Sequence, residues 1–162
     1  MGRFQGLSGI KTNQGGLYFL DGDYLVELDE VKMIVSRKKQ DTWIVSGKVL
    51  ESTNPQRAPG CKPSQVIVLK EEILETCMGN IKAFAAAVLG IVDPDAYVPD
   101  LKPGETPETA KDRFWDETLE ALVSEAQPAK GLKIKLNVTT IKTKAGKDFG
   151  KHQWTHVAEK VA

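Results

Sequence analysis

Residues 22–35 read GDYLVELDEVKMIV, and their apolar pattern predicts one long strand that bends near its middle. Apolar side chains occupy the even positions from Tyr24 to Leu28 and the odd positions from Val31 to Val35. Alternation of this kind is typical of a strand with one buried face. A change from even to odd positions is what one extra residue, a β-bulge, produces in a strand. We therefore expect a single strand bent by a bulge.

Four further strands and two helices are expected around this strand. Apolar residues at three- and four-residue steps predict a helix over 79–89, which Gly90 can end. A second, acidic helix is expected over 107–127, because Thr106 and Pro107 make a favourable helix start. Alternating or β-branched apolar runs predict the other strands, at about 42–52, 64–70, 132–138 and 149–157.

The order of these elements predicts a mainly β protein with helices, namely a five-stranded OB-fold barrel of Greek-key topology. One helix between strands three and four belongs to that fold, and the acidic helix would be an insertion beside it. Other small barrels and α+β folds share this order of elements. The expected division of the chain is a flexible N-terminal arm over 1–20, a single OB-fold domain over 21–158 whose loop plus acidic-helix insertion covers 91–131, and a short tail over 159–162.

The net charge of the chain hides regions of opposite charge. The 162 residues include 22 Lys and Arg against 22 Asp and Glu, a composition that fits one ordinary domain. Zero net charge argues against a uniformly basic nucleic-acid-binding protein. Residues 91–127, however, carry 10 acidic and 3 basic side chains, whereas residues 128–162 carry 2 acidic and 8 basic ones. This asymmetry predicts a local anion-binding face with acidic surface elsewhere.

Membrane association, disulfides and catalysis are not expected. Apolar runs are shorter than the roughly 18 residues that a membrane-spanning helix needs. Cys61 and Cys77 form no C-x-x-C pair, which favours a reducing cytoplasm over a disulfide framework. No phosphate-loop or nucleophile-elbow motif occurs, and His152 and His156 lie too far apart along a strand for joint metal binding. We therefore expect no enzyme, no catalytic residue, no metal and no cofactor.

The expected fold places two basic turns beside one groove. OB-folds bind oligonucleotides or oligosaccharides across strands two and three, between the loops that join strands one to two and four to five. Those loops are here the lysine-rich turns 36–41 and 141–150, and aromatic residues follow each of them. Lysines would bind phosphates, and aromatic rings would stack on bases. The candidate nucleic-acid-binding residues are Arg37, Lys38, Lys39, Trp43, Lys133, Lys135, Lys142, Lys144, Lys147, Phe149, Lys151, His152 and Trp154.

Structural explanations for these residues remain open beside the functional one. Basic turns are commonly solvated turns that also protect sheet edges. Trp43 and Trp154 would also suit the core, because Trp buries a large apolar area. Lys133 and Lys135 would also suit the solvated face of strand four.

Several short stretches together carry a resemblance to a known family. They are Gly22-Asp23-Tyr24-x-Val26, Val31-Lys32 with Ser36-Arg37-Lys38-Lys39, Val49-Leu50-Glu51-Ser52, Gly79-Asn80-Ile81-Lys82-Ala83-Phe84, and Ile141-Lys142-Thr143-Lys144-Ala145-Gly146 with Phe149 and Trp154. In these stretches, which span most of residues 22–157, the chain resembles small phage-encoded single-stranded-DNA-binding proteins with an OB-fold. The resemblance implies protection of single strands during replication and recombination in the host cytoplasm. Such proteins often recruit partners through an acidic C-terminal tail, but this chain ends in AEKVA, so the acidic helix over 107–127 is the expected site for replication proteins.

Two hypotheses of different classes follow. The first is largely sequence-independent binding of single-stranded DNA in phage DNA replication or recombination, with RNA left open as a ligand. The alternative is a protein-interaction or assembly module, such as a virion or replisome component, without nucleic-acid binding. In that alternative the acidic helix of one copy binds the basic hairpin of another, which would give a homo-oligomer.

Overall fold

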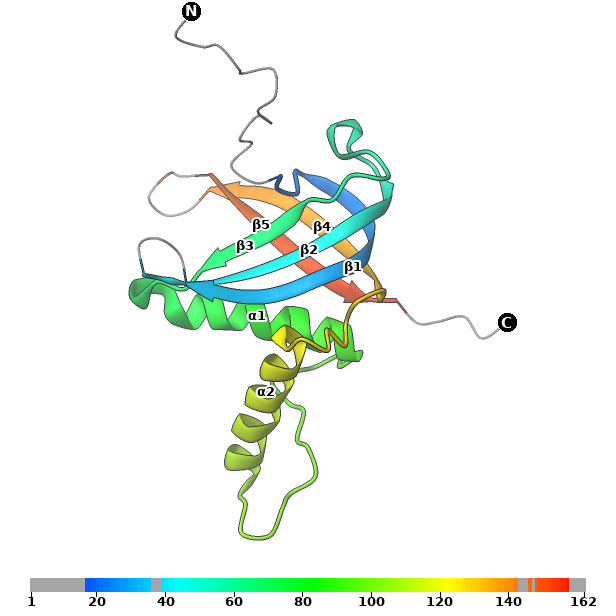
Figure 1. Cartoon of the computed structure of the whole chain (residues 1–162). Helices are drawn as coiled ribbons and strands as arrows, with labels where there is room; N and C mark the ends of the chain where they lie inside the picture. Colours follow the sequence, from blue (N-terminus) through cyan, green and yellow to red (C-terminus); the bar gives the residue numbers. More distant parts are fainter. Residues whose placement is uncertain (1–16, 36–38, 143–145, 147, 158–162) are drawn as a thin grey trace, which may run out of the picture.

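The computed structural model describes residues 17–35, 39–142, 146 and 148–157 of the chain. This part is mainly β, with a five-stranded antiparallel sheet of order β3-β2-β1-β4-β5 and two α-helices in the connection from β3 to β4 (Figure 1). The mainly β class with five strands is thus confirmed. The elements are β1 (Gly22–Val35), β2 (Asp41–Ser52), β3 (Ser64–Val68), α1 (Leu74–Leu89), α2 (Pro107–Val123), β4 (Lys133–Lys142) and β5 (Asp148–His156), with short 3-10 helices η2 (Pro55–Arg57) and η3 (Glu71–Ile73).

β1 is the central strand, and its bulge lies where the sequence predicts it. The strand pairs with β2 along most of its length, and a register shift between Leu28 and Glu30 leaves Asp29 outside the ladder. Leu28, before the shift, is 2% exposed, and Val31, after it, is 1% exposed. The extra residue therefore keeps both apolar runs on the inner face of the sheet.

Where the ladder with β4 ends, a glutamine side chain forms hydrogen bonds with the backbone of β1. The ladder between β1 and β4 extends only as far as Glu27. Beyond it, Val31 N–H donates to Gln127 Oε1 at 2.8 Å, and Gln127 Nε2 donates to Val31 O at 2.8 Å. Gln127 reaches this position from a turn, with a φ of 42°, so the expected helix over 107–127 is too long and α2 ends at Val123.

α1 begins at Leu74, more than one turn before the expected start at Gly79. Its first turns carry Leu74, which is 44% exposed, and Met78, which is 39% exposed. Cys77, 4% exposed, is the buried side chain of this stretch. Glu75 lies in the first turn, where a carboxylate favours the positive end of the helix dipole. The expected placement is therefore wrong at the start of α1 and at the end of α2.

The core lies between α1 and the inner face of the sheet. Phe84 of α1, 0% exposed, packs edge to face against Trp43 and Trp154, with ring centroids 6.2 Å and 5.1 Å apart. β3 and β5 are the edge strands, and no ladder joins them within the described residues. Trp154 Nε1 donates to Gln65 Oε1 at 2.9 Å, so side chains connect the two edges instead. The sheet is therefore open and compatible with a barrel-like fold.

Residues 17–20, which were expected in the flexible arm, pack against the sheet. Phe19 is 5% exposed, and the Tyr24 hydroxyl donates to Leu20 O at 2.6 Å. Burial raises the pKa of Tyr24 above its usual value, which keeps this hydroxyl protonated as a donor. Residues 1–16 and 158–162, which include most of the expected arm and the whole tail, lie outside the described part of the chain.

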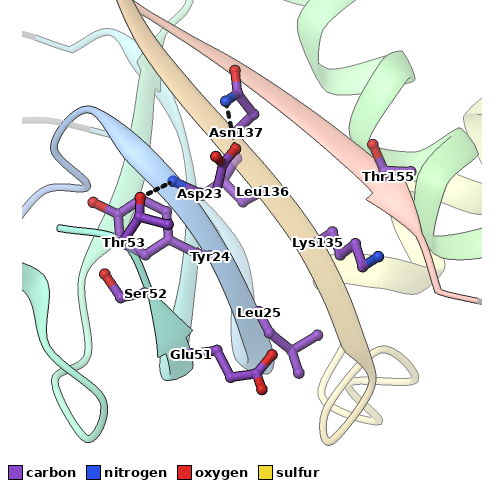
Figure 2. Close-up of a pocket in the computed structure, with 10 residues that line it drawn as sticks. All are labelled: Asp23, Tyr24, Leu25, Glu51, Ser52, Thr53, Lys135, Leu136, Asn137 and Thr155. Carbon is purple, nitrogen blue, oxygen red and sulfur yellow. Dashed lines mark hydrogen bonds between the residues drawn. The ribbon is translucent and has the colours of Figure 1, made fainter.

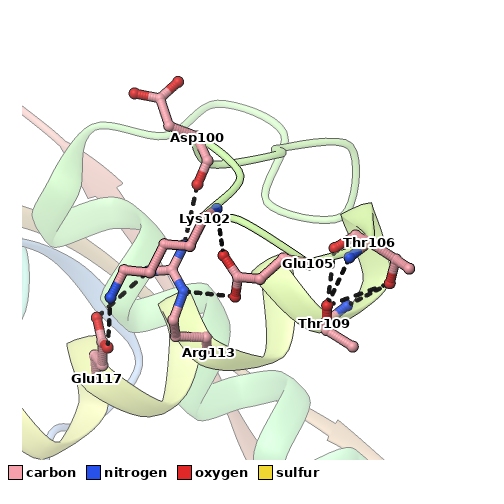
Figure 3. Close-up of polar contacts among 7 residues, drawn as sticks. All are labelled: Asp100, Lys102, Glu105, Thr106, Thr109, Arg113 and Glu117. Atoms are coloured by element: carbon pink, nitrogen blue, oxygen red, sulfur yellow. Dashed lines mark hydrogen bonds and ion pairs between the residues drawn. The ribbon is translucent and has the colours of Figure 1, made fainter.

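α2 and the loop before it form an arm that projects away from the sheet (Figure 1). Arg113 ties this loop to the helix, because its Nε donates to Glu105 at 2.8 Å and its Nη2 donates to Asp100 O at 3.0 Å (Figure 3). The hydrogen bond from Arg113 lowers the pKa of Glu105, so this carboxylate stays ionised. Thr106 caps the helix as expected, in a capping box with Thr109. Neither this helix nor any other in the described ranges is long and apolar enough to span a membrane.

Candidate nucleic-acid interface

The two edge strands of the open sheet leave a groove of 330 Å³ between them. Gln65–Val68 of β3 form one part of its lining and Gly150–His152 of β5 another. Cys77 and Asn80 line it from α1. We call this feature the edge groove.

The lining of the edge groove is close in the structure to segments that follow the two expected basic turns. Leu69 N–H donates to Asp41 O at 2.8 Å, which joins the chain after β3 to the first residue of β2. Gly150–His152 belong to the first part of β5. The described ends of β1 and β4 lie on the same side of the molecule (Figure 1).

Lysines are the charged side chains of the edge groove. Lys70 and Lys151 are exposed and line it, and no carboxylate is among its described lining residues. Neither lysine forms an ion pair within 4.0 Å with a described residue. Val66 and Ile73, 37% and 50% exposed, add apolar surface beside them. Free cations next to apolar surface suit a ligand that combines phosphates with flat bases.

His152 lines the inner part of the groove as a neutral ring. Its Nδ1 lies 3.0 Å from Gly150 O, and because a carbonyl oxygen only accepts, Nδ1 carries the proton. Burial lowers the pKa of His152 from its ordinary 6.5, against the opposite effect of the hydrogen bond to Gly150. Its Nε2 is buried and has no hydrogen-bond partner within the described residues. His152 therefore contributes a neutral ring to the groove wall, and its acceptor nitrogen is enclosed by the protein.

The structure places three of the expected cations at the ends of the two turns. Lys39 is exposed after the β1–β2 turn, with a φ of 59°, and Lys142 is exposed at the end of β4. Lys151 lines the edge groove itself. Arg37, Lys38, Lys144, Lys147 and the side chain of Phe149 lie outside the described part of the chain.

The two tryptophans of the expected site pack on or within the core. Trp43 is 1% exposed, so its ring offers no free face to a base and it has the core role that the sequence left open. Trp154 is half-buried between the rings of Phe19 and Phe84, with centroids 6.0 Å and 5.1 Å away. Its hydrogen bond to Gln65 fixes a residue of the groove lining. Stacking on the Trp43 ring is therefore not available in this structure.

A larger hollow of 480 Å³ lies on the outer face of β1 and β4, and Figure 2 shows its lining. Its charged lining residues are Lys135 and the carboxylates Asp23 and Glu51. Asp23 Oδ1 accepts a hydrogen bond from Asn137 Nδ2 at 2.7 Å. Two carboxylates against one lysine repel a polyanion, so this hollow suits phosphates less well than the edge groove does. Lys133, also exposed on β4, does not line the edge groove either.

Comparison with known proteins assigns no family to the chain. No known family model matches it, and no curated protein matches it. Within the described ranges, no group of three or more His, Cys, Asp or Glu side chains is arranged to hold a metal ion. The candidate interface is therefore defined by the chain's own geometry.

The groove residues of β3 and α1 are not marked by any pattern from which a site was predicted. Lys70 directly follows the β-branched run of strand three, and this position is the one signal that could have drawn attention to it. Val66 and Asn80 carry no such signal, because one belongs to an apolar run and the other to a helix. Their place in the site depends on the gap between β3 and β5, which no local pattern encodes.

Proposed function

We propose that this protein binds single-stranded DNA on an OB-fold, with little dependence on base sequence and without catalysis. The observation that carries this proposal is the edge groove, whose charged lining within the described residues consists of Lys70 and Lys151. The strand order and the gap between β3 and β5 support the OB-fold as the specific form of this barrel-like sheet. That fold binds oligonucleotides between the two hairpin loops. Lys151 and His152 of the edge groove directly follow the second of these loops.

In this proposal the sugar–phosphate backbone passes Lys70 and Lys151, whose charges replace the counterions of the phosphates. The bases lie against Val66 and Ile73, because every base has an apolar face regardless of its identity. This arrangement tolerates any sequence, since it reads no unique pattern of donors and acceptors.

Further lysines would lengthen the path of the strand. Lys39 and Lys142 are exposed at the ends of the two turns, and the lysine-rich turns themselves continue the basic sequence. If about four lysines each neutralise one phosphate, a tenfold rise in salt should lower the affinity several hundredfold, since each contact contributes about 0.7 to the logarithmic slope. A steep salt dependence is therefore the signature of this mode of binding.

Fluorescence anisotropy of a labelled oligothymidine, titrated with the protein at low and at tenfold higher salt, tests the proposal. We expect saturable binding at low salt, strong weakening at high salt, and weaker binding of a duplex of the same length. An oligouridine of equal length establishes whether RNA is also a ligand. No binding of oligothymidine at low salt would refute the proposal.

The resemblance of the sequence supports a biological setting for this activity. We place the protein in phage DNA replication or recombination in the host cytoplasm, where it would protect single strands. The exposed carboxylates of α2, such as Asp116 and Glu120, are the surface that we propose for contacts with replication proteins or further copies of the chain.

A further inference from the structure

A separate hollow of 210 Å³ lies between β1, α1 and α2. None of its lining residues lines the edge groove. Met33 of β1 and Met78 of α1 contribute to the lining, so we call it the methionine hollow. Its volume accommodates inserted side chains rather than a folded domain.

At this hollow, the sheet face that is buried elsewhere in the core becomes partly exposed. Trp43 is 1% exposed, but Met33, its partner in the ladder between β1 and β2, is 39% exposed. Met78, on α1, is also 39% exposed. Val35 and Leu74, 66% and 44% exposed, extend the same strand face and helix face outward. Unbranched, polarisable methionine side chains adapt readily to an incoming apolar surface.

Carboxylates of α2 add negative charge to this apolar surface. Asp116 and Glu120 line the methionine hollow, and both are exposed. Neither forms an ion pair within 4.0 Å with a described residue. Like charges one helical turn apart destabilise a helix, so a cation bound at this position would relieve a repulsion built into α2.

We propose that the methionine hollow docks a basic amphipathic helix of a partner protein. Its apolar anchors would insert beside Met33 and Met78, and its Lys or Arg side chains would pair with Asp116 and Glu120. Charge complementarity favours a basic helix over other occupants, because the same carboxylates repel an acidic segment and the phosphates of a nucleic acid. Apolar anchors three or four residues apart are the usual way in which a helix fills such a groove.

The test uses the full chain and three fluorescein-labelled synthetic peptides. The first is the basic amphipathic helix LKKLLKLLKKLLKL, the second its acidic counterpart LEELLELLEELLEL, and the third a scramble of the first without an apolar face. We expect the basic helix to bind with an affinity at least about tenfold higher than the other two. Absence of binding by the basic helix, or equal binding of the acidic one, would overturn the proposal.

Matched variants locate the binding site. Asp116→Asn with Glu120→Gln removes the carboxylates of the hollow, and Glu108→Gln with Asp112→Asn removes the same charge from exposed positions of the same helix that do not line it. The first pair should weaken peptide binding about tenfold and the second less than about twofold. Met78→Ser, at a side chain 39% exposed, should also weaken it about tenfold with an unchanged thermal unfolding midpoint. Equal effects of the two charge pairs would overturn the proposal.

Two further measurements separate this proposal from other occupants and from DNA binding. A concentration-dependent dimer in size-exclusion chromatography that Met78→Ser abolishes would identify a second copy of the chain as the occupant and overturn the proposal. Oligothymidine binding should be unchanged in Met78→Ser, because the hollow and the edge groove share no residue. Failure of DNA binding with intact peptide binding would therefore refute only the proposed function.

Discussion

Replacing Lys70 and Lys151 together with glutamine should weaken the binding of oligothymidine about 25-fold at 0.1 M salt, since each lysine contact contributes about 0.7 to the logarithmic salt slope of a single strand. The electrostatic contribution of a contact vanishes at about 1 M salt by extrapolation. At 0.1 M salt, one contact therefore raises the affinity about fivefold. Two independent contacts multiply, and the slope itself should fall by about 1.4. The fold should be unaffected, because both side chains are exposed and form no ion pair with a described residue.

The assay is fluorescence anisotropy at five or more salt concentrations, with the urea unfolding midpoint as a check on folding. Lys133→Gln with Lys135→Gln is the matched control, since it removes the same charge from the outer face of β4. The control should leave the slope nearly unchanged. If the control lowers the slope and the Lys70 and Lys151 pair does not, the strand crosses the outer face and the assignment of the edge groove is refuted.

Three further predictions concern stability. Gly47→Ala should destabilise the protein by about 1–3 kcal/mol in urea unfolding, because the new Cβ would overlap a buried valine of β1. Gly79→Ala has open space around it in α1 and should stabilise the protein by about 0.5–1 kcal/mol. Equal effects of the two substitutions would contradict this packing. Gln127→Ala removes both hydrogen bonds to Val31 and should cost about 1–3 kcal/mol, and an unchanged urea midpoint would show that they contribute nothing. Because burial lowers the folded-state pKa of His152, the unfolded state binds more protons, so stability should fall as the pH drops below about 6.5 and should be fully present above it. His152→Gln should flatten this dependence in urea midpoints between pH 7.5 and 5, and an unchanged slope would assign it to another group.

Local patterns predicted the parts of the fold that local physics decides. The bulge of β1 was predictable because alternation continues on both sides of Asp29 with its parity changed. The start of α2 was predictable because Thr106 and Pro107 have intrinsic preferences for the first positions of a helix. The end of α2 was not, because Gln127 leaves the helix to bond with the backbone of β1, which is distant in the sequence.

The candidate site was predictable to the extent that it adjoins the two basic turns. Lys151 and His152 follow the second turn directly, and both line the edge groove. The inward packing of Trp43 agrees with the core role that the large apolar area of Trp favours. The sequence left a stacking role open beside it, because alternation shows that a strand has two faces without showing which one α1 covers. Lys70 was missed because a lysine after a strand has no distinguishing local feature.

By itself, the sequence of this protein determined its five strands, the bend of the central one and the presence of a basic region after an acidic one, since alternation, capping and charge are properties of neighbouring residues. Only the tertiary structure decided that β3 and β5 remain unpaired and that Lys70 and Lys151 face the same groove. Which side chains surround a gap depends on how far the sheet curls and where α1 packs across it. Those quantities are set by the packing of distant segments, so no single stretch of the chain specifies them.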